Sequence, residues 1–136
     1  MKSEEIKKNR DFRTVSFWMT LLVAAGIIFI GSRFIIHPAA GADGYGIPFS
    51  GAQDLPYGRI KGIRDIFSGV ILLLFLFLKM RKAAALALTA AIIIPVTDFL
   101  IVLTTNGPGD IQHLLIHGMT VIYMIATSVL LFRETK

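Results

Sequence analysis

The chain has 136 residues, of which 54% are hydrophobic before its 12 glycines are counted, and its mean hydropathy is +0.69. Soluble domains are roughly 45–50% apolar with glycine included, so these values exclude an ordinary soluble domain and indicate a protein whose solvent is lipid. The net charge of +5 does not indicate nucleic acid, because the 14 Lys and Arg residues stand at the ends of apolar runs instead of clustering on a polar domain.

Four apolar stretches approach the roughly 20 residues that a helix needs to cross a bilayer, at about 15–36, 63–79, 83–104 and 111–132. They predict one all-α domain, an integral membrane four-helix bundle with up-down topology. The first stretch follows a basic arm over residues 1–14. Its apolar run is longer than that of a signal peptide and contains Arg33, although the sequence HPAAGA leaves cleavage open as an alternative.

The charges at the ends of these stretches predict their orientation. The N-terminal arm, the KMRK turn and the C-terminal RETK hold five, three and two Lys or Arg residues, ten in all. The opposite ends hold four: Arg33, Arg59, Lys61 and Arg64. Because positive residues favour the cytoplasmic side, both termini are expected in the cytoplasm, in a plasma (inner) membrane, with the arm near anionic headgroups.

The connection between the first two helices, residues 37–62, should then face outward together with the turn TTNGPGD. It is rich in Gly and Pro and is expected to be irregular. It also holds Tyr45, Phe49 and Tyr57, more apolar surface than a solvated loop needs. These side chains would either fold down as a lid on the outer mouth of the bundle or rest in the headgroup layer.

Ionisable residues gather at the outer ends of all four predicted helices, where several share a face at three- or four-residue spacing. They are Arg33, His37, Lys61, Arg64, Asp65, Asp98, His113 and His117. The inner halves, such as VILLLFLFL and AAALALTAA, contain no ionisable residue. This asymmetry predicts a polar pocket that is open outward and closed inward.

Asp98 is the residue that most needs a partner. A central Asp costs about 2.5–3.5 kcal/mol in lipid, so Asp98 is expected to pair with Arg33 or Arg64, or to bond to a histidine. At a rise of about 1.5 Å per residue, Asp98 and His117 lie at matching depths, roughly 9–10 Å inside the outer ends of their helices. Pro95 lacks the N–H that would bond Ala91, which predicts a bend one turn below Asp98.

Four segments carry a family resemblance. In this order, HPAAGADGYGIPF, KGIRDIFSGVILLLFL, IIIPVTDFLIVL and HLLIHGMTVIYMI resemble a family of small four-helix membrane proteins of bacteria and fungi that is catalogued as a domain of unknown function. A looser similarity is to the DoxX-like membrane proteins. The resemblance covers nearly the whole chain after the arm and implies the fold and a special role for Lys61, Arg64, Asp65, Asp98 and His117. Neither likeness supplies a reaction or a ligand.

Three classes of function are compatible with this pattern. In the first, the pocket binds a lipid or a small amphipathic molecule, or belongs to a transport component, with these ligand-binding candidates: Arg33, His37, Lys61, Arg64 and His113. In the second, the protein is an isomerase, cyclase or hydrolase whose acid–base candidates are Asp98, His117 and Asp65. In the third, the polar residues form a satisfied network that fixes helix register in an accessory subunit.

No cofactor is expected, because the sequence has no nucleophile elbow, phosphate loop or dinucleotide fingerprint, and with no Cys it has no thiolate. No metal is predicted either. His113 and His117 with Asp98 or Asp65 leave a Zn or Fe site as an alternative, which the nearby arginines disfavour. The expected partner is the lipid bilayer, with no nucleic acid; a homo-oligomer or a larger membrane complex is an alternative.

Overall fold

The computed structural model describes residues 14–134, which form α-helices and one short 3-10 helix and contain no strand. The all-α prediction is confirmed. The long helices are α2 (Val15–Ile36), α4 (Leu55–Phe77), the consecutive α5 (Arg81–Ala91) and α6 (Ile93–Asn106), and α7 (Ile111–Glu134). The short ones are α3 (Pro38–Tyr45) and the 3-10 helix Ala52–Asp54. Except for Thr14, the predicted basic arm lies outside the described residues.

The connection between α2 and α4 is more helical than the sequence predicts. With α5 and α6 counted as one interrupted helix, residues 14–134 form five α-helices and not the predicted four, because the sequence did not predict α3. Pro38 occupies the first turn of α3, where its missing N–H is not needed, and Gly46 ends this helix with a φ of 102°. Helix α4 begins at Leu55 and not near residue 63. Gly and Pro therefore mark helix ends, and irregular backbone in this connection is confined to His37 and residues 46–51.

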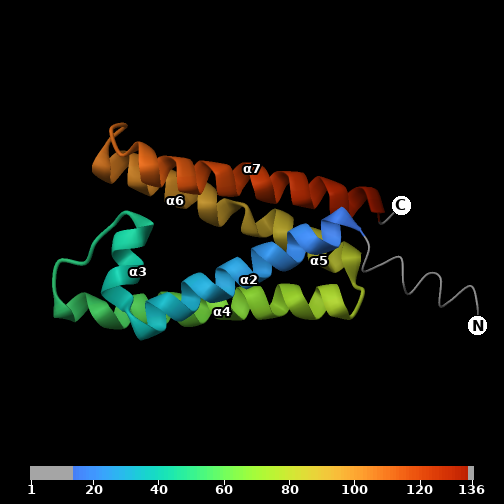
Figure 1. Cartoon of the computed structure of the whole chain (residues 1–136), viewed down its shortest axis with the longest axis horizontal. Helices are drawn as coiled ribbons and strands as arrows, with labels where there is room; N and C mark the ends of the chain where they lie inside the picture. The colour runs from blue at the N-terminus through green and yellow to red at the C-terminus, as the bar shows by residue number, and fades with distance from the viewer. Residues whose placement is uncertain (1–13, 135–136) are drawn as a thin grey trace, which may run out of the picture.

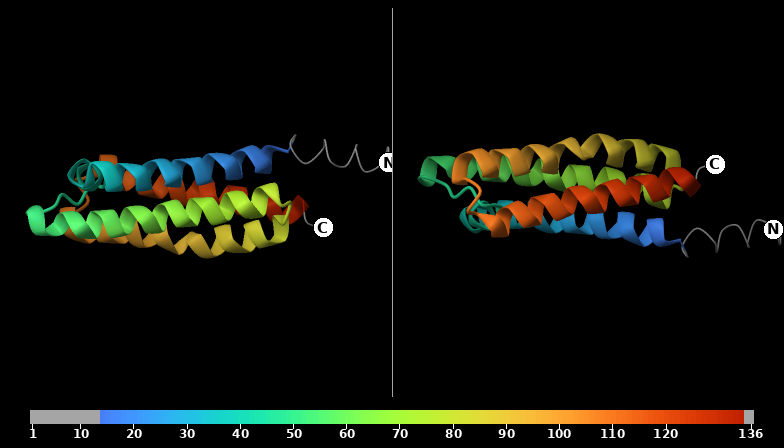
Figure 2. Two further views of the ribbon diagram at one scale, coloured as in Figure 1. Left: turned by 90° about the horizontal axis from the view of Figure 1, so that it is seen from below. Right: turned by 90° about the horizontal axis from the view of Figure 1, so that it is seen from above.

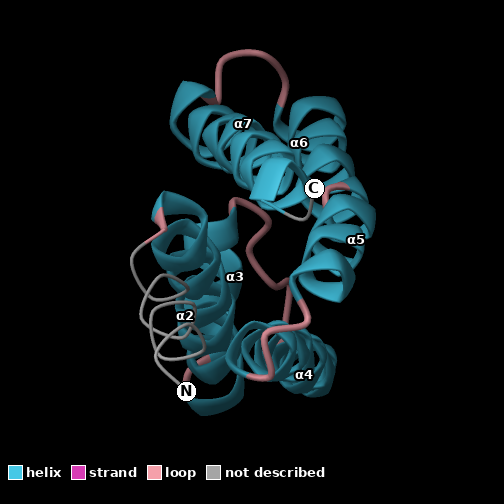
Figure 3. Ribbon diagram, turned by 90° about the vertical axis from the view of Figure 1, so that its right-hand side faces the viewer, coloured by secondary structure: helices cyan, strands magenta, loops and turns pink. Residues whose placement is uncertain are grey.

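The long helices form two antiparallel pairs, α2 with α4 and α5–α6 with α7 (Figures 1 and 3). Glycines bring the first pair into backbone contact. A Cβ atom added to Gly31 would lie 2.6 Å from the carbonyl oxygen of Gly62, and one added to Gly62 would lie 2.6 Å from the carbonyl oxygen of Gly31. No side chain fits at such distances, so α2 and α4 approach closely only because these residues have none.

Helix α5–α6 is interrupted at Ile92, three residues before Pro95. Pro95 has no N–H to donate to the carbonyl of Ala91. Three residues earlier, the N–H of Ile92 donates to the carbonyl oxygen of Thr89 at 3.2 Å, in a turn tighter than that of an α-helix. Figure 2 shows the bow of α5–α6 at this junction. The bend that the sequence predicts below Asp98 is therefore present.

Three of these segments are long and apolar enough to cross a membrane: α2, Arg81–Asn106 (α5 with α6) and α7. Large apolar side chains are exposed along them, including Trp18, Phe29 and Ile122, as expected for helices that face lipid. Helix α4 has 23 residues, but residues 59–65 carry four charges. Its apolar part is thus shorter than that of the other three.

The packed core lies away from α3. Its buried members are Ala24, Leu72, Ala84, Ala85, Leu88, Met124 and Leu131. We call the end at which α2 begins and α7 ends the terminal end, and the opposite one the α3 end. At the terminal end, Ser16 Oγ donates to Glu134 Oε2 at 2.5 Å, and Arg81 forms an ion pair with the same carboxylate. These bonds join α2, α5 and α7.

Candidate functional site

A cavity of about 190 Å³ lies at the α3 end, flanked by both helix pairs and by α3. Its wall is mostly apolar and includes Ile27, Ile30, Phe34, Ala91, Ile94, Pro95, Ile116 and Met124. Its polar side chains are Arg33, Tyr45, Lys61, Asp65, Ser68, Asp98, His117 and Thr120. Residues far apart in the sequence therefore meet around one space.

Tyr45, the last residue of α3, connects two of the predicted site residues. Its phenol donates to Asp98 Oδ1 at 2.5 Å, and its carbonyl oxygen accepts from His117 Nε2 at 3.0 Å. The rings of Tyr45 and His117 pack edge to face with centroids 4.9 Å apart. Because a carbonyl can only accept, His117 carries a proton on Nε2. Asp98 and His117 are therefore joined through Tyr45.

The phenol of Tyr45 is held in its protonated form. Burial, together with the hydrogen bond to Asp98 and the negative charges of Asp98 and Asp65, raises the pKa of Tyr45 far above its ordinary value. Each of these causes disfavours a phenolate. Tyr45 therefore remains a hydrogen-bond donor to Asp98 at any physiological pH.

Lys61 and Asp65 form an ion pair one turn apart on α4. The Lys61 ammonium also lies 4.5 Å from the ring centroid of Phe34 and 5.4 Å from that of Tyr45. Both distances are short enough for cation–π attraction. The charge of Lys61 is thus balanced by Asp65 and by two aromatic rings.

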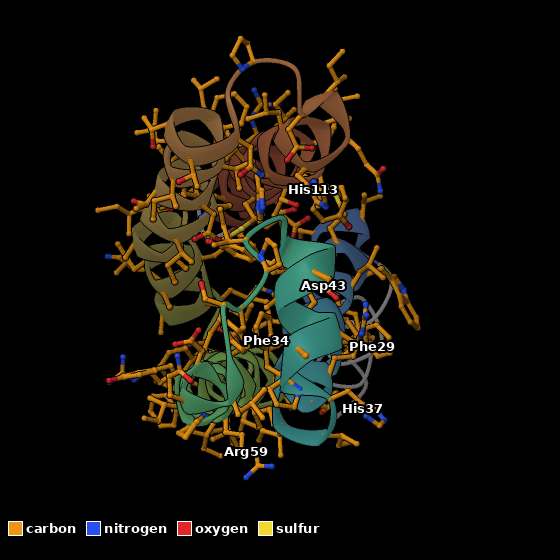
Figure 4. All side chains as sticks on the ribbon, turned by 90° about the vertical axis from the view of Figure 1, so that its left-hand side faces the viewer. Phe29, Phe34, His37, Asp43, Arg59 and His113 are labelled. Carbon is orange, nitrogen blue, oxygen red and sulfur yellow. The ribbon has the colours of Figure 1, made fainter. Side chains whose placement is uncertain are left out.

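Of the eight site residues that the sequence predicts, five line the cavity: Arg33, Lys61, Asp65, Asp98 and His117. Three do not: His37, Arg64 and His113. Arg64 and His37 are exposed, and Figure 4 shows His37 pointing away from the helices.

The counter-charge that the sequence predicts for Asp98 is not found among residues 14–134. Arg33 is exposed, and its Nη2 donates to the carbonyl oxygen of Ala40 at 3.1 Å. The exposed Arg64 does not line the cavity and forms no ion pair with Asp98. Asp98 is stabilised instead by the neutral phenol of Tyr45.

His113 belongs to a second cluster, at the tip of the α3 end (Figure 4). Its Nδ1 donates to Asp110 Oδ1 at 2.7 Å, while Asn106 Nδ2 donates to Asp110 Oδ2 at 2.6 Å and to the carbonyl oxygen of Gly46 at 2.7 Å. The hydrogen bonds from Asn106 and His113 lower the pKa of Asp110. This cluster fastens the α6–α7 turn to the end of α3.

The metal alternative does not fit the geometry. Among residues 14–134, no group of three His, Asp or Glu side chains is placed to hold a metal ion. His113 bonds to Asp110 and His117 bonds to Tyr45, so the two imidazoles do not share a carboxylate.

From the sequence, Tyr45 is expected only to add apolar surface to the connection, and its bonds to Asp98 and His117 are not predicted. The signal was present, because Pro38 can start a helix and Gly46 can end one. A short helix over residues 38–45 folds back from the end of α2 and carries Tyr45 at its last position. At that position the ring of a tyrosine can pack against apolar side chains while its hydroxyl group forms a hydrogen bond.

Residues 24–131 match a protein family described as Domain of unknown function (DUF4267). No curated protein and no solved structure matches the chain significantly. The family match includes all eight predicted site residues and confirms the main resemblance drawn from the sequence; it gives no support to the DoxX-like similarity or to the bacterial and fungal distribution. The chain belongs to the family defined by this domain of unknown function.

Proposed function

We propose that this protein spans a membrane as a four-helix bundle and binds a lipid or a small amphipathic molecule in the cavity at the α3 end. In this proposal α4 is the fourth span, since 23 helical residues extend about 34 Å at about 1.5 Å each, enough for a hydrocarbon core of about 30 Å. Its charged residues then lie near the membrane surface or in the cavity.

The observation that carries the proposal is the division of the cavity into apolar walls and a few polar groups, Asp98, His117 and the Lys61–Asp65 pair among them. Ligand sites commonly have this composition. An apolar cavity of about 150 Å³ can hold benzene, whereas drug-sized ligands need about 300 Å³ or more. A volume of about 190 Å³ therefore fits a compact molecule or one end of a lipid.

The proposed orientation places the terminal end in the cytoplasm. Helix α2 begins there and α7 ends there, and Lys79, Arg81 and Lys82 lie in or beside the same turn between α4 and α5. Positive residues favour the cytoplasmic side. The cavity would then open toward the outside of a plasma membrane, with the packed core beneath it.

Filling the cavity tests the proposal. Ala91 lines the cavity and its neighbour Ala90 is exposed on the same helix, so Ala91→Phe and Ala90→Phe add the same side chain inside and outside. We expect a small molecule to co-purify with the wild type and with Ala90→Phe, and to be lost from Ala91→Phe, as measured by native mass spectrometry. A wild-type protein that carries no molecule, or an Ala91→Phe variant that retains it, would contradict the proposal.

A structural role in an accessory subunit is the second candidate. It is favoured by one observation: no buried side-chain nitrogen or oxygen among residues 14–134 lacks a hydrogen bond. A satisfied network of this kind can fix helix register without binding anything. Under this alternative, Ala91→Phe would lower stability and leave the set of co-purified molecules unchanged.

A further inference from the structure

The polar groups in the cavity have acceptors to spare. Ser68 Oγ donates to the carbonyl oxygen of Arg64 at 2.9 Å, and Thr120 Oγ1 donates to that of Ile116 at 2.8 Å. A hydroxyl has a single proton, so both oxygens can only accept a further bond. The carboxylate of Asp98 is also an acceptor, and within residues 14–134 its hydrogen bond to Tyr45 uses Oδ1 alone.

His117 adds a fourth acceptor. The residue is only 7% exposed, and its Nε2 proton is donated to Tyr45. Its Nδ1 has no hydrogen-bond partner in the described part of the chain, yet no fully buried side-chain nitrogen there is unpaired. Nδ1 therefore keeps accessible surface, and His117 lines the cavity. A deeply buried imidazole with an open acceptor indicates a ligand that donates.

Among the remaining lining donors, Arg33 is exposed and donates through Nη2 to the carbonyl oxygen of Ala40, and the other two are held within the cavity. Tyr45 donates to Asp98, and Lys61 is held by Asp65 and by the ring faces of Phe34 and Tyr45. Asp98 is the lining carboxylate for which residues 14–134 supply no cation at ion-pairing distance, and Asp65 adds its negative field at the same phenol, as the raised pKa of Tyr45 reflects. The complement of this end of the cavity is a positive group that donates hydrogen bonds.

From this arrangement we infer that the ligand is a small apolar molecule with a protonated amine as its head, an inference that rests on the proposed function. A primary ammonium offers three N–H donors to the open acceptors of Asp98, His117, Ser68 and Thr120. Its charge is balanced by Asp98, which makes the bond between them a strong, charge-assisted one. At these acceptors a carboxylate or phosphate head would meet the like charge of Asp98 and no donor, because Lys61 is paired with Asp65 and Arg33 is exposed and bonded to Ala40.

Three compounds on one ring test the inference: cyclohexylamine, cyclohexanol and cyclohexanecarboxylate. Their dissociation constants are measured by isothermal titration calorimetry at neutral pH on the full chain in an uncharged detergent. We expect the amine to bind at least about tenfold more tightly than the alcohol, the gain typical of a hydrogen bond to a charged group, and the carboxylate to bind most weakly. This comparison needs no substitution.

Variants then locate the amine. Asp98→Asn keeps the shape of the side chain and is expected to abolish the advantage of the amine over the alcohol. Asp43→Asn is the matched control, because Asp43 is exposed and does not line the cavity, and there the advantage should remain. An amine advantage that survives in Asp98→Asn would overturn the inference.

The failure of the inference can be told from the failure of the proposed function. If the alcohol or the carboxylate binds as tightly as the amine and Ala91→Phe abolishes that binding, the cavity is a ligand site but the amine assignment is wrong. If none of the three compounds binds while a co-purified molecule is lost from Ala91→Phe, the inference alone fails. If binding of the three compounds is unaffected by Ala91→Phe, both are wrong.

Discussion

The terminal end and the α3 end share the long helices α2, α4, α5–α6 and α7 but are packed in different ways. At the terminal end, α5 lies against α7 through small and aliphatic residues such as Ala84, Ala85 and Leu88, and Thr89 and Ser128 share a hydrogen bond of 2.5 Å. At the other end, α3 lies between the pairs, which Figure 1 shows farther apart there. One end is filled by its own side chains, and the other retains a cavity.

The cavity thus lies where the helix pairs are farther apart, although its lining also includes the small residues Gly41, Gly44 and Ala91. Ile27, Ile30 and Ile94 in the cavity wall are larger than the alanines of the core. These large side chains do not fill the space at this end, where α3 lies between the helix pairs. Tyr45 then fixes that separation, since it bonds to α6 through Asp98 and to α7 through His117.

The largest loss of stability is expected from a substitution at the contact between α2 and α4. In Gly62→Ala, the new Cβ would lie 2.6 Å from the backbone oxygen of Gly31, which cannot move without shifting α2. We expect the free energy of unfolding, measured by titration with SDS in mixed micelles, to fall by about 3 kcal/mol. Gly26→Ala is the control, because no atom of the described residues lies within 4 Å of its Cβ position. Equal losses in the two variants would show that α2 and α4 do not depend on this contact.

The second largest loss of stability is expected in the packed core at the terminal end, where a buried and an exposed leucine can be compared. Leu88 is 1% exposed, whereas Leu86 on the same helix is 54% exposed. Leu88→Ala should lower the free energy of unfolding by about 2 kcal/mol, the lower end of the range for buried leucine because lipid replaces water outside the core. Leu86→Ala should change it by less than about 0.5 kcal/mol. Similar values for both would mean that the terminal end is not packed as described.

A smaller loss is expected at the α3 end. Tyr45→Phe keeps the ring contacts and removes the only hydrogen bond that the Asp98 side chain forms within residues 14–134. Because Asp98 is partly accessible and can be hydrated, we expect a loss of about 1 kcal/mol in the same SDS titration. Tyr57→Phe serves as the control, since Tyr57 is 70% exposed. No difference between the two variants would show that the bond between the Tyr45 phenol and Asp98 does not hold α3 in place.

The sequence is sufficient for features that depend on a single helix. The break before Pro95 follows from helix geometry, because Pro lacks the N–H that the helix needs. Which of Arg64 and Asp65 faces inward does not, because adjacent residues differ by about 100° around a helix and the rotation of α4 is set by its glycine contact with α2.

Contacts between residues far apart in the chain likewise cannot be predicted from the sequence. The bonds of Tyr45 join residues 53 and 72 positions apart, to Asp98 and His117. They depend on how α3 folds back over α6 and α7, which no local pattern specifies. For the same reason the sequence could identify Asp98 as a residue in need of a partner, but it could not identify that partner.

The smallest effect concerns the tip of the α3 end and depends on pH. Hydrogen bonds from Asn106 and His113 hold the pKa of Asp110 below its ordinary value of 3.8. A carboxyl group whose pKa is lower in the folded state stabilises the fold above its ordinary pKa, and this contribution is lost as the pH falls through the folded value.

Between about pH 5 and about pH 2.5, the unfolding temperature of the wild type should therefore fall more than that of Asp110→Asn. The difference should be slight, because Asp110 is near the surface and such interactions are screened by water. Parallel curves for the two proteins would show that the hydrogen bonds to Asp110 do not stabilise the α6–α7 turn.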